Sequence, residues 1–168
     1  MSLAFKTATR SDIDSIIALQ EQIWEPTYRP ILDPEQIRYM FEAIYSKEAL
    51  LDQMTNENQV FILAYRDQKL TGFAAYSRNA SDDERFKLHK IYVLPSEQGK
   101  GTGRFLLEEV MRRCRAAGGN RLSLNVNRYN KARQFYERLG FVVVREEDIP
   151  IGPYWMNDYV LEKELVAH

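Results

Sequence analysis

The segment Ile91–Arg104 constrains the fold of this chain more strongly than any other part of the sequence. An apolar run suited to a strand is followed by a loop with glycines at positions 99, 101 and 103, and then by a stretch with helical periodicity. At the start of a helix, consecutive backbone N–H groups point outward, and together with the helix dipole they bind phosphate without a charged side chain. The sequence therefore predicts a phosphate-binding turn, to which Lys100 and Arg104 can add positive charge.

Two common nucleotide-binding motifs compete for this glycine-rich loop, and both fail on spacing. A P-loop requires Ser or Thr directly after its lysine, whereas Lys100 is followed by Gly101. A dinucleotide-binding fingerprint requires a third glycine at the position where Arg104 stands. A glycine-rich turn with a purely structural role stays open as the alternative.

The order of the expected elements sets the fold class. Hydrophobic alternation and helical periodicity are the signals used to find them. Strands are expected at Leu3–Thr9, Val60–Tyr65, Leu70–Tyr76, Phe86–Val93, Arg121–Val126, Phe141–Val144 and Tyr159–Leu165, and helices at Ile13–Ile23, Pro34–Tyr45, Lys47–Met54, Gly101–Ala117 and Asn130–Leu139. This order predicts an α/β (α+β) fold in one domain over residues 1–168, with a largely antiparallel central sheet of about seven strands and helices on both faces.

Capping residues and prolines set the expected ends of the first three helices. Ser11 is suited to cap the first helix, and Pro26 and Pro30 are expected to end it and start a loop. Asp33 followed by proline predicts an N-cap and first helical position for the second helix. Ser46 is the expected cap of the third helix, and Arg66–Lys69 is the expected polar turn of a β-hairpin.

The apolar residues of the strand Phe86–Val93 break the regular alternation of a strand. Leu88 and Ile91 do not fall on one face of an unbroken strand. Either a β-bulge lies between them, or both faces of the strand are buried. The broken pattern also predicts that this strand separates from Arg121–Val126 near Val93, leaving backbone groups free for a ligand.

Composition excludes several classes of function. The chain has 168 residues and a net charge of −1, so no bulk positive field exists to hold nucleic acid. Its apolar runs are too short to span a bilayer, and its N-terminus lacks a signal-peptide pattern, so a cytoplasmic location is expected. Cys114 is the single cysteine and is expected in the core, while His89 and His168 are not spaced as a metal pair. No metal is therefore expected.

Two blocks of sequence resemble one enzyme superfamily. Gln98–Gly103 is similar to the Q/R-x-x-G-x-G/A pyrophosphate loop of the GNAT acetyltransferases. Asn130–Phe141 resembles the N-x-x-A-x-x-F-Y-x-x-x-G-F segment of the same superfamily. The blocks stand in the family's order, separated by a helix and a strand, and the likeness covers Phe61–Leu165. The resemblance implies a GNAT-like fold and an N-acetyltransferase that uses acetyl-CoA as cosubstrate.

The resemblance also implies positions for the cofactor. Backbone groups of Ile91, Tyr92 and Val93 would meet the pantetheine arm, and Asn130 would bond to the same arm. Arg133 and Arg138 are candidates for the 3′-phosphate, with ordinary solvated helix charges as the alternative. The pyrophosphate would lie on the loop formed by Gln98, Gly99, Lys100, Gly101, Thr102, Gly103 and Arg104.

Acetyl transfer to an amine requires a proton acceptor, stabilisation of the oxyanion and departure of a thiolate. The resemblance places Tyr136 near the thioester sulfur; an ordinary tyrosine pKa of about 10 keeps it protonated and able to donate. The alternative is that Tyr136 packs in the core beside Phe135. The backbone N–H at Val93 would suit the oxyanion. The base is left open among His89, Glu84 and Glu25.

A finer likeness concerns the acceptor. Thr27–Pro30, Ile44–Leu50 and Asp158-Tyr159 are similar to the PaiA-like spermidine/spermine acetyltransferases, which favours a polyamine-like small amine. Trp24, Glu25 and Tyr28 are candidate residues for binding the acceptor. For Trp24 and Tyr28 the alternative is simple packing at the end of the first helix. Glu21 and Asp33 are further carboxylates that could pair with an ammonium group of the acceptor.

One departure from the family pattern and two alternative functions stay open. Relatives often carry glutamate where this chain has Lys87, which weakens the assignment of a base to that strand. The alternatives in function are acetylation of a protein N-terminus or lysine, and a regulatory module that senses acyl-CoA without turnover. A homodimer is the expected assembly by base rate.

Overall fold

The computed structural model describes residues 2–165, so His168 lies outside the described residues. The chain forms two compact units. Unit 1 comprises residues up to Ser77 together with Lys90–Val110, and unit 2 comprises Arg78–His89 together with the residues from Met111 onward. The strand β4 and the helix α4 each contribute residues to both units. The expectation of one domain over the whole chain stays a prediction.

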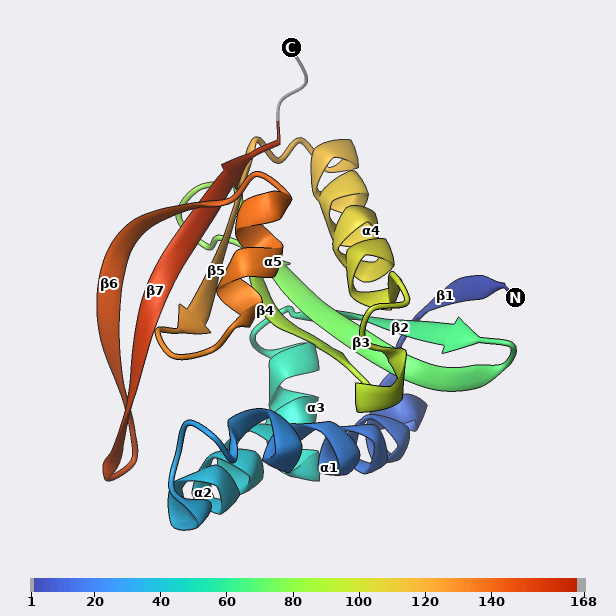
Figure 1. Cartoon of the computed structure of the whole chain (residues 1–168). Coiled ribbons are helices and arrows are strands. Elements are labelled where there is room, and N and C mark those ends of the chain that lie inside the picture. Colours follow the sequence, from blue (N-terminus) through green and yellow to red (C-terminus); the bar gives the residue numbers. More distant parts are fainter. Residues whose placement is uncertain (1, 166–168) are drawn as a thin grey trace. The chain divides into compact units, whose positions relative to one another are not determined.

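Seven strands and five α-helices lie within residues 2–165 (Figure 1). In chain order they are β1 Leu3–Thr7, the 3₁₀ helix η1 Arg10–Asp12, α1 Ile13–Tyr28, α2 Pro34–Tyr45, α3 Lys47–Thr55, β2 Val60–Arg66, β3 Lys69–Arg78, β4 Arg85–Val93, the 3₁₀ helix η2 Pro95–Glu97, α4 Thr102–Ala116, β5 Arg121–Asn127, α5 Ala132–Arg138, β6 Val142–Ile151 and β7 Tyr154–Glu164. The pairs β1–β2, β2–β3, β5–β7 and β6–β7 are antiparallel, and β4–β5 is parallel. The predicted mixed, largely antiparallel α/β fold is confirmed.

In unit 1, helices cover both faces of the sheet. The ring of Phe5 on β1 stacks on Phe105 of α4 with centroids 4.0 Å apart. On the other face, Phe73 of β3 meets the ring of Tyr45 of α2 at 6.4 Å. Neighbouring residues of a strand point to opposite faces, and Gly72, next to Phe73, faces α4. Unit 1 therefore has α4 on one face of its strands and α2 on the other.

The first helix differs from the prediction at both ends. Thr9 and Asp12, rather than Ser11, form the capping contact, since the Thr9 N–H donates to Asp12 Oδ2 at 2.8 Å. The helix α1 continues through Pro26 to Tyr28. A proline inside a helix removes one backbone hydrogen bond. Here side-chain packing supports the last turn: the rings of Trp24 and Tyr28 lie tilted against each other with centroids 4.4 Å apart, and the Tyr28 hydroxyl shares a hydrogen bond with that of Tyr92.

The other local signals in unit 1 are confirmed. Asp33 is the N-cap of α2 and Pro34 its first residue. The Ser46 hydroxyl caps α3 by accepting the N–H of Ala49 at 3.1 Å. The β2–β3 hairpin turns at Asp67-Gln68, which have positive φ angles of 49° and 72°. That pair of left-handed residues matches the twist of a two-residue hairpin turn.

Unit 2 contains a parallel pair and a long hairpin. The β4–β5 ladder runs from Arg85↔Arg121 to Leu88↔Leu124. The two strands were predicted to separate near Val93, and their ladder already ends at Leu88. The hairpin β6–β7 is longer at its turn end than predicted, since β6 extends to Ile151 through Pro150 (Figure 1). Proline is tolerated in a strand that pairs on one side only, and β6 is the outer strand beside β7.

The buried positions of β4 are Phe86, Leu88 and Lys90, whereas Ile91 is only half-buried. Burial thus alternates regularly, and the pattern needs neither a bulge nor two buried faces. The anomaly arises because a lysine takes the next buried position. Its Nζ donates to Oε1 of Gln59 at 2.8 Å and lies 5.2 Å from the centroid of the Phe61 ring.

The described helices include none that is long and apolar enough to cross a bilayer. The expected burial of Cys114 is confirmed, because its side chain in α4 is 0% exposed. Burial raises the pKa of that thiol to about 12. The described residues also hold no cluster of His, Cys, Asp or Glu arranged to take a metal ion.

Candidate active site

The predicted phosphate loop of unit 1 has the backbone that its glycines suggest. Gly99 and Gly101 adopt φ angles of +79° and +85°, a left-handed region open mainly to glycine. A Cβ placed on either residue would find no heavy atom within 4 Å. The loop is therefore exposed, and the space beside both glycines is free for a bound group.

Part of the loop's amide set is available to a ligand. The N–H groups of Gln98 and Lys100 donate to the carbonyls of Pro95 and Glu97. Within the described part of the chain, the N–H groups of Gly99, Gly101, Thr102 and Gly103 donate to no backbone carbonyl. Those four amides, rather than every amide from Gln98 to Gly103, are the ones free to meet an anion.

An ion pair from outside the sequence motif lies beneath this loop. Nε of Arg66 lies 2.8 Å from Oε1 of Glu97, and the hydroxyl of Thr102 donates to the same oxygen at 2.8 Å. The hydrogen bond from Arg66 holds the pKa of Glu97 below its ordinary value, against the opposing effect of burial. Sequence reasoning missed Arg66 and Glu97, because nothing local links a residue of a hairpin to one beside the loop.

The end of β4 lies close to β3. The Leu94 N–H donates to the carbonyl of Thr71 at 2.8 Å. A Cβ on Gly72 would stand 2.8 Å from the carbonyl oxygen of Tyr92 and 2.9 Å from Cγ1 of Val93. Glycine at position 72 is therefore required for β3 to approach this part of β4. The predicted pantetheine residues Ile91–Val93 are half-buried.

Two of the three predicted acceptor residues lie together. Tyr28 and Tyr92 share a hydrogen bond between their hydroxyls at 3.1 Å, and the ring of Trp24 lies 5.9 Å from that of Tyr92. Trp24 is buried and donates its Nε1 hydrogen to the Ile37 carbonyl at 2.9 Å. Glu25 lies apart from this aromatic cluster, on the exposed surface of α1, where it pairs with Arg29.

Unit 2 holds Tyr136, the predicted catalytic tyrosine. Tyr136 lies on α5 and is 8% exposed. The centroid of its ring lies 5.3 Å from that of Phe135 and 6.0 Å from that of Phe141. Asn130 precedes the helix, and its Oδ1 accepts the N–H of Ala132 at 2.9 Å. Asn130 therefore has a structural role at the start of α5 beside any role toward a ligand.

The two predicted 3′-phosphate residues have different surroundings. Arg133 pairs with Glu137 at 3.1 Å, and its guanidinium lies 4.7 Å from the centroid of the Tyr159 ring. Arg138 is exposed in the last turn of α5. Among residues 2–165 its side chain forms no hydrogen bond or ion pair. Arg138 is thus the arginine with an unengaged guanidinium.

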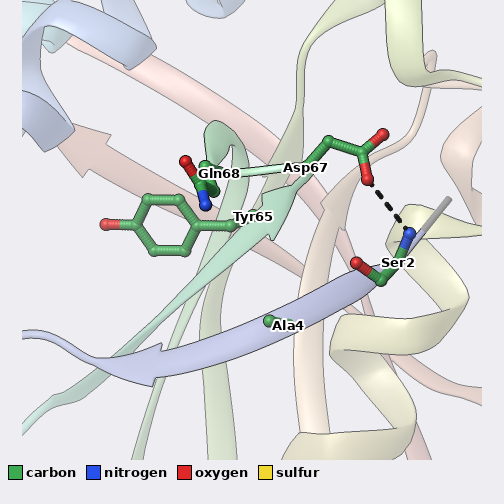
Figure 2. Close-up of a pocket in the computed structure, with 5 residues that line it drawn as sticks. All are labelled: Ser2, Ala4, Tyr65, Asp67 and Gln68. Carbon is green, nitrogen blue, oxygen red and sulfur yellow. Dashed lines mark hydrogen bonds between the residues drawn. The ribbon is translucent and has the colours of Figure 1, made fainter.

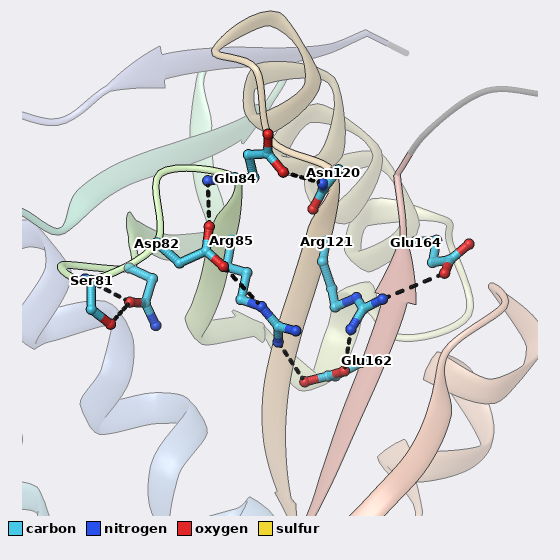
Figure 3. Close-up of polar contacts among 9 residues, drawn as sticks. Ser81, Asp82, Glu84, Arg85, Asn120, Arg121, Glu162 and Glu164 are labelled. Carbon is cyan, nitrogen blue, oxygen red and sulfur yellow. Dashed lines mark hydrogen bonds and ion pairs between the residues drawn. The ribbon is translucent and has the colours of Figure 1, made fainter.

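Of the open candidates for the base, Glu84 is engaged in the surface network of unit 2. Its Oε2 accepts from Nδ2 of Asn120 at 2.7 Å (Figure 3). In the same network Arg85 and Arg121 reach Glu162 from neighbouring strands, at 3.5 and 3.6 Å (Figure 3). A polar cavity of about 280 Å³ is lined by Arg85, Arg121 and Glu162, but not by Glu84, together with Asn79, Phe86, Lys87, Ser123, Asn125, Arg145, Glu147 and Val160.

A hollow in unit 1 contains none of the predicted site residues. It has a volume of about 620 Å³ and lies at the β2–β3 turn, lined by Ser2, Ala4, Tyr65, Asp67 and Gln68 (Figure 2). Here the Ser2 N–H donates to Asp67 Oδ1 at 3.2 Å (Figure 2), and the Asp67 N–H donates to the Ser2 carbonyl at 3.2 Å. It brings together no acid–base pair and no anion-binding amides, so we do not take it as the site.

Residues 28–152 match the family model described as the Acetyltransferase (GNAT) domain. This chain belongs to the GNAT acetyltransferase family. The expected family is therefore confirmed, and with it the enzyme class, N-acetyltransferase.

Related GNAT proteins extend the match to nearly the whole chain. An uncharacterized N-acetyltransferase of Mycobacterium tuberculosis is 29% identical over 93% of this chain and 99% of its own. The spermidine N(1)-acetyltransferase of Thermoplasma acidophilum is 27% identical over 98% of each chain.

Solved structures have the same fold. The PaiA N-acetyltransferase of Thermoplasma acidophilum, solved in complex with coenzyme A, has a TM-score of 0.82 and 27% identity, covering 98% of this chain and 99% of its own. The ribosomal-protein-S18-alanine N-acetyltransferase of Escherichia coli has a TM-score of 0.74 at 18% identity, over 99% of this chain and 96% of its own. At that identity the second likeness shows the GNAT fold alone.

Proposed function

We propose that this GNAT enzyme transfers the acetyl group of acetyl-CoA to a primary amine of a small molecule, with a polyamine as the favoured acceptor. The observation that carries the proposal is the Gln98–Arg104 loop, whose left-handed glycines present free amides to open space. The similarity to a spermidine N(1)-acetyltransferase over 98% of the chain supports the choice of acceptor.

The coenzyme fits the chemistry of the residues on the loop. Amides at a helix N-terminus bind phosphate groups, so those of Gly99, Gly101 and Gly103 would receive the pyrophosphate. Backbone groups of Ile91–Val93 would meet the pantetheine arm, and the side chain of Asn130 would assist. Arg138 is the better candidate for the 3′-phosphate, since Arg133 is already paired with Glu137. When bound, acetyl-CoA supplies the activated acetyl group.

Tyr136 would donate a hydrogen bond to the leaving thiolate. An ordinary tyrosine pKa is about 10 and that of a thiol about 8.5, so the hydroxyl is protonated when the thiolate forms. Packing against Phe135 and Phe141 restricts its ring. The N–H of Val93 would stabilise the oxyanion. No enzyme nucleophile is needed, because the amine attacks directly.

The acceptor would be held on the aromatic side of unit 1. An alkylammonium is attracted to the faces of Trp and Tyr rings, and Trp24, Tyr28 and Tyr92 lie in one cluster. Glu25 would act from the outer surface of α1, where the hydrogen bond from Arg29 lowers the pKa of its carboxyl and keeps it ionised.

The amine must lose a proton before it attacks, because a lysine-like amine has a pKa of about 10.4.

An acceptor panel tests this proposal. The enzyme is incubated with acetyl-CoA and spermidine, spermine or simple diamines, and in parallel with peptides that carry a free N-terminus or a lysine. Mass spectrometry of the products identifies the acetylated amine. We expect polyamine acetylation to be the fastest. Faster acetylation of peptides would favour a protein acetyltransferase, and coenzyme A binding without any product would favour a regulatory module.

A further inference from the structure

Three residues from three elements meet beneath the coenzyme loop. Arg66 is the last residue of β2, Glu97 the last of η2 and Thr102 the first of α4. The Thr102 hydroxyl donates to Glu97 Oε1 at 2.8 Å and accepts from a terminal nitrogen of Arg66 at 3.2 Å. With the 2.8 Å contact from Arg66 Nε to the same Glu97 oxygen, the three side chains form a closed triangle.

The triangle holds the loop at both ends. Glu97 stands directly before the residues 98–101 and Thr102 directly after them. Between these ends, a terminal nitrogen of Arg66 lies 3.5 Å from the carbonyl oxygen of Lys100. The Lys100 N–H returns to the Glu97 carbonyl at 3.2 Å. The spacing between the start and end of the loop is therefore set by the side chains of Arg66, Glu97 and Thr102.

The charge of Glu97 is unexpected at this place. Its side chain is 7% exposed, and a buried charge needs a partner. A carboxylate close to a loop that takes pyrophosphate would also repel the ligand. Arg66, 13% exposed, neutralises it, and Lys100 Nζ lies 4.0 Å from the other carboxylate oxygen. The pair therefore supplies a rigid contact while leaving the loop free of net negative charge.

We propose that Arg66 and Glu97 are positioning residues for the coenzyme: through Thr102 and the Lys100 carbonyl they hold the loop 98–101 in the form that binds the pyrophosphate. The proposal rests on the proposed coenzyme site at this loop. It predicts that the network acts on binding of acetyl-CoA and leaves the rate at saturating acetyl-CoA and the KM for the amine largely unchanged. Guanidinium is the suitable cation because it offers several donors in a fixed plane, which an ammonium does not.

The first experiment compares three variants by calorimetric titration with coenzyme A. Arg66→Met leaves the Glu97 carboxylate without its arginine beside the loop, so affinity should fall on the order of tenfold or more. Adding Glu97→Gln removes the uncompensated charge, so the double variant should recover part of the loss. Arg85→Met, which breaks an arginine–glutamate pair in unit 2, is the matched control and should bind coenzyme A as the wild type does.

A second pair guards against loss of folding. Thr102→Val keeps the shape of the side chain but removes the hydroxyl that joins the two ends of the loop, and Thr102→Ser keeps the hydroxyl. We expect Thr102→Val to raise the KM for acetyl-CoA several-fold with little change in kcat, and Thr102→Ser to restore it. Melting curves without coenzyme show that each variant is folded.

The outcomes separate this proposal from the proposed function. If the wild type binds coenzyme A and the folded Arg66→Met and Thr102→Val variants bind it equally well, the network is purely structural and the proposal is overturned, while the function stands. If the double variant binds no better than Arg66→Met, the role of charge is overturned. If the wild type itself binds no coenzyme A, the proposed function fails, and this proposal fails with it.

Discussion

The side-chain amide of Asn125 lies 3.2 Å from Oδ2 of Asp158 and 3.3 Å from Oε1 of Glu147, so one amide joins carboxylates on β7 and β6. The other oxygen of Asp158, Oδ1, has no hydrogen-bond partner within the described residues, and the residue is 5% exposed. Burial raises the pKa of Asp158, and the charge of Glu147 adds to that effect. Ionised Asp158 therefore weakens the folded state.

Asp158→Asn should raise the melting temperature at neutral pH. A carboxyl whose folded pKa is raised contributes stability that is complete below its unfolded pKa of about 3.9 and is lost as pH rises through the folded pKa. The amide never ionises, so the gain over wild type should grow with pH and then level off. Each kcal/mol corresponds to about 2–4 °C for a chain of this size. Thermal unfolding from pH 4 to 8 measures it, with the exposed Asp148→Asn as control. A lower melting temperature at pH 7 would contradict the argument.

Gly101→Ala should weaken coenzyme binding, and Gly118→Ala should not. Both glycines have positive φ, +85° and +88°, and neither has a heavy atom within 4 Å of a Cβ. Alanine in this conformation costs about 1 kcal/mol in either place. Only Gly101 stands on the proposed pyrophosphate loop, so calorimetry should show a loss of affinity for coenzyme A in that variant alone. If both variants bound coenzyme A with equal affinity, the loop would not be part of the coenzyme site.

Gly72→Ala should disturb the end of β4 and lower both stability and coenzyme affinity. Its Cβ would stand 2.8 Å from the backbone oxygen of Tyr92, which has no flexible route away. Overpacking typically costs about 1–3 kcal/mol. Gly119→Ala is the control, since its Cβ would meet the Phe86 ring at 2.6 Å in unit 2. We expect similar losses of melting temperature, with reduced coenzyme affinity for Gly72→Ala only. If Gly72→Ala bound coenzyme A with unchanged affinity, the approach of β3 to β4 would have no role in coenzyme binding.

Tyr136→Phe should lower kcat and kcat/KM for the amine together, because in the proposed role the hydroxyl would act only as the thiolate leaves. A thiolate is already a fair leaving group, so we expect the low end of acid catalysis, on the order of a hundredfold or less. Affinity for coenzyme A should change little, since the ring remains. Tyr129→Phe, at a residue 76% exposed, is the control. Turnover within about twofold of wild type would falsify the catalytic role.

Elements governed by local contacts could be predicted from the sequence. Asp33 with Pro34, and Ser46, fixed the starts of α2 and α3 because a cap needs only the residues beside it. The end of α1 could not be predicted, since packing of Tyr28 outweighs the cost of Pro26. The extent of β6 depended on its place at an outer edge, which tolerates Pro150 and is set by the order of strands.

The candidate site divides in the same way. The glycines of the Gly99–Gly103 turn lie close together in the sequence, so the conformation of this turn could be predicted. The contact between Arg66 and Glu97 joins residues 31 positions apart and has no local signal. Lys90 misled the interpretation of β4, because its buried ammonium is satisfied by Gln59 and lies near the ring of Phe61, neither of them a neighbour in sequence.

Because Cys114 is buried, the folded enzyme should not react with disulfide reagents. A thiol with a pKa of about 12 carries almost no thiolate at neutral pH, and the thiolate is the species that reacts. A chromogenic disulfide added to an assay will therefore register the coenzyme A that the proposed reaction sets free in each turnover, without a background from the folded protein. Without substrates, the same dye will react only when the surroundings of Cys114 open, so its slow phase measures how often this part of unit 2 unfolds.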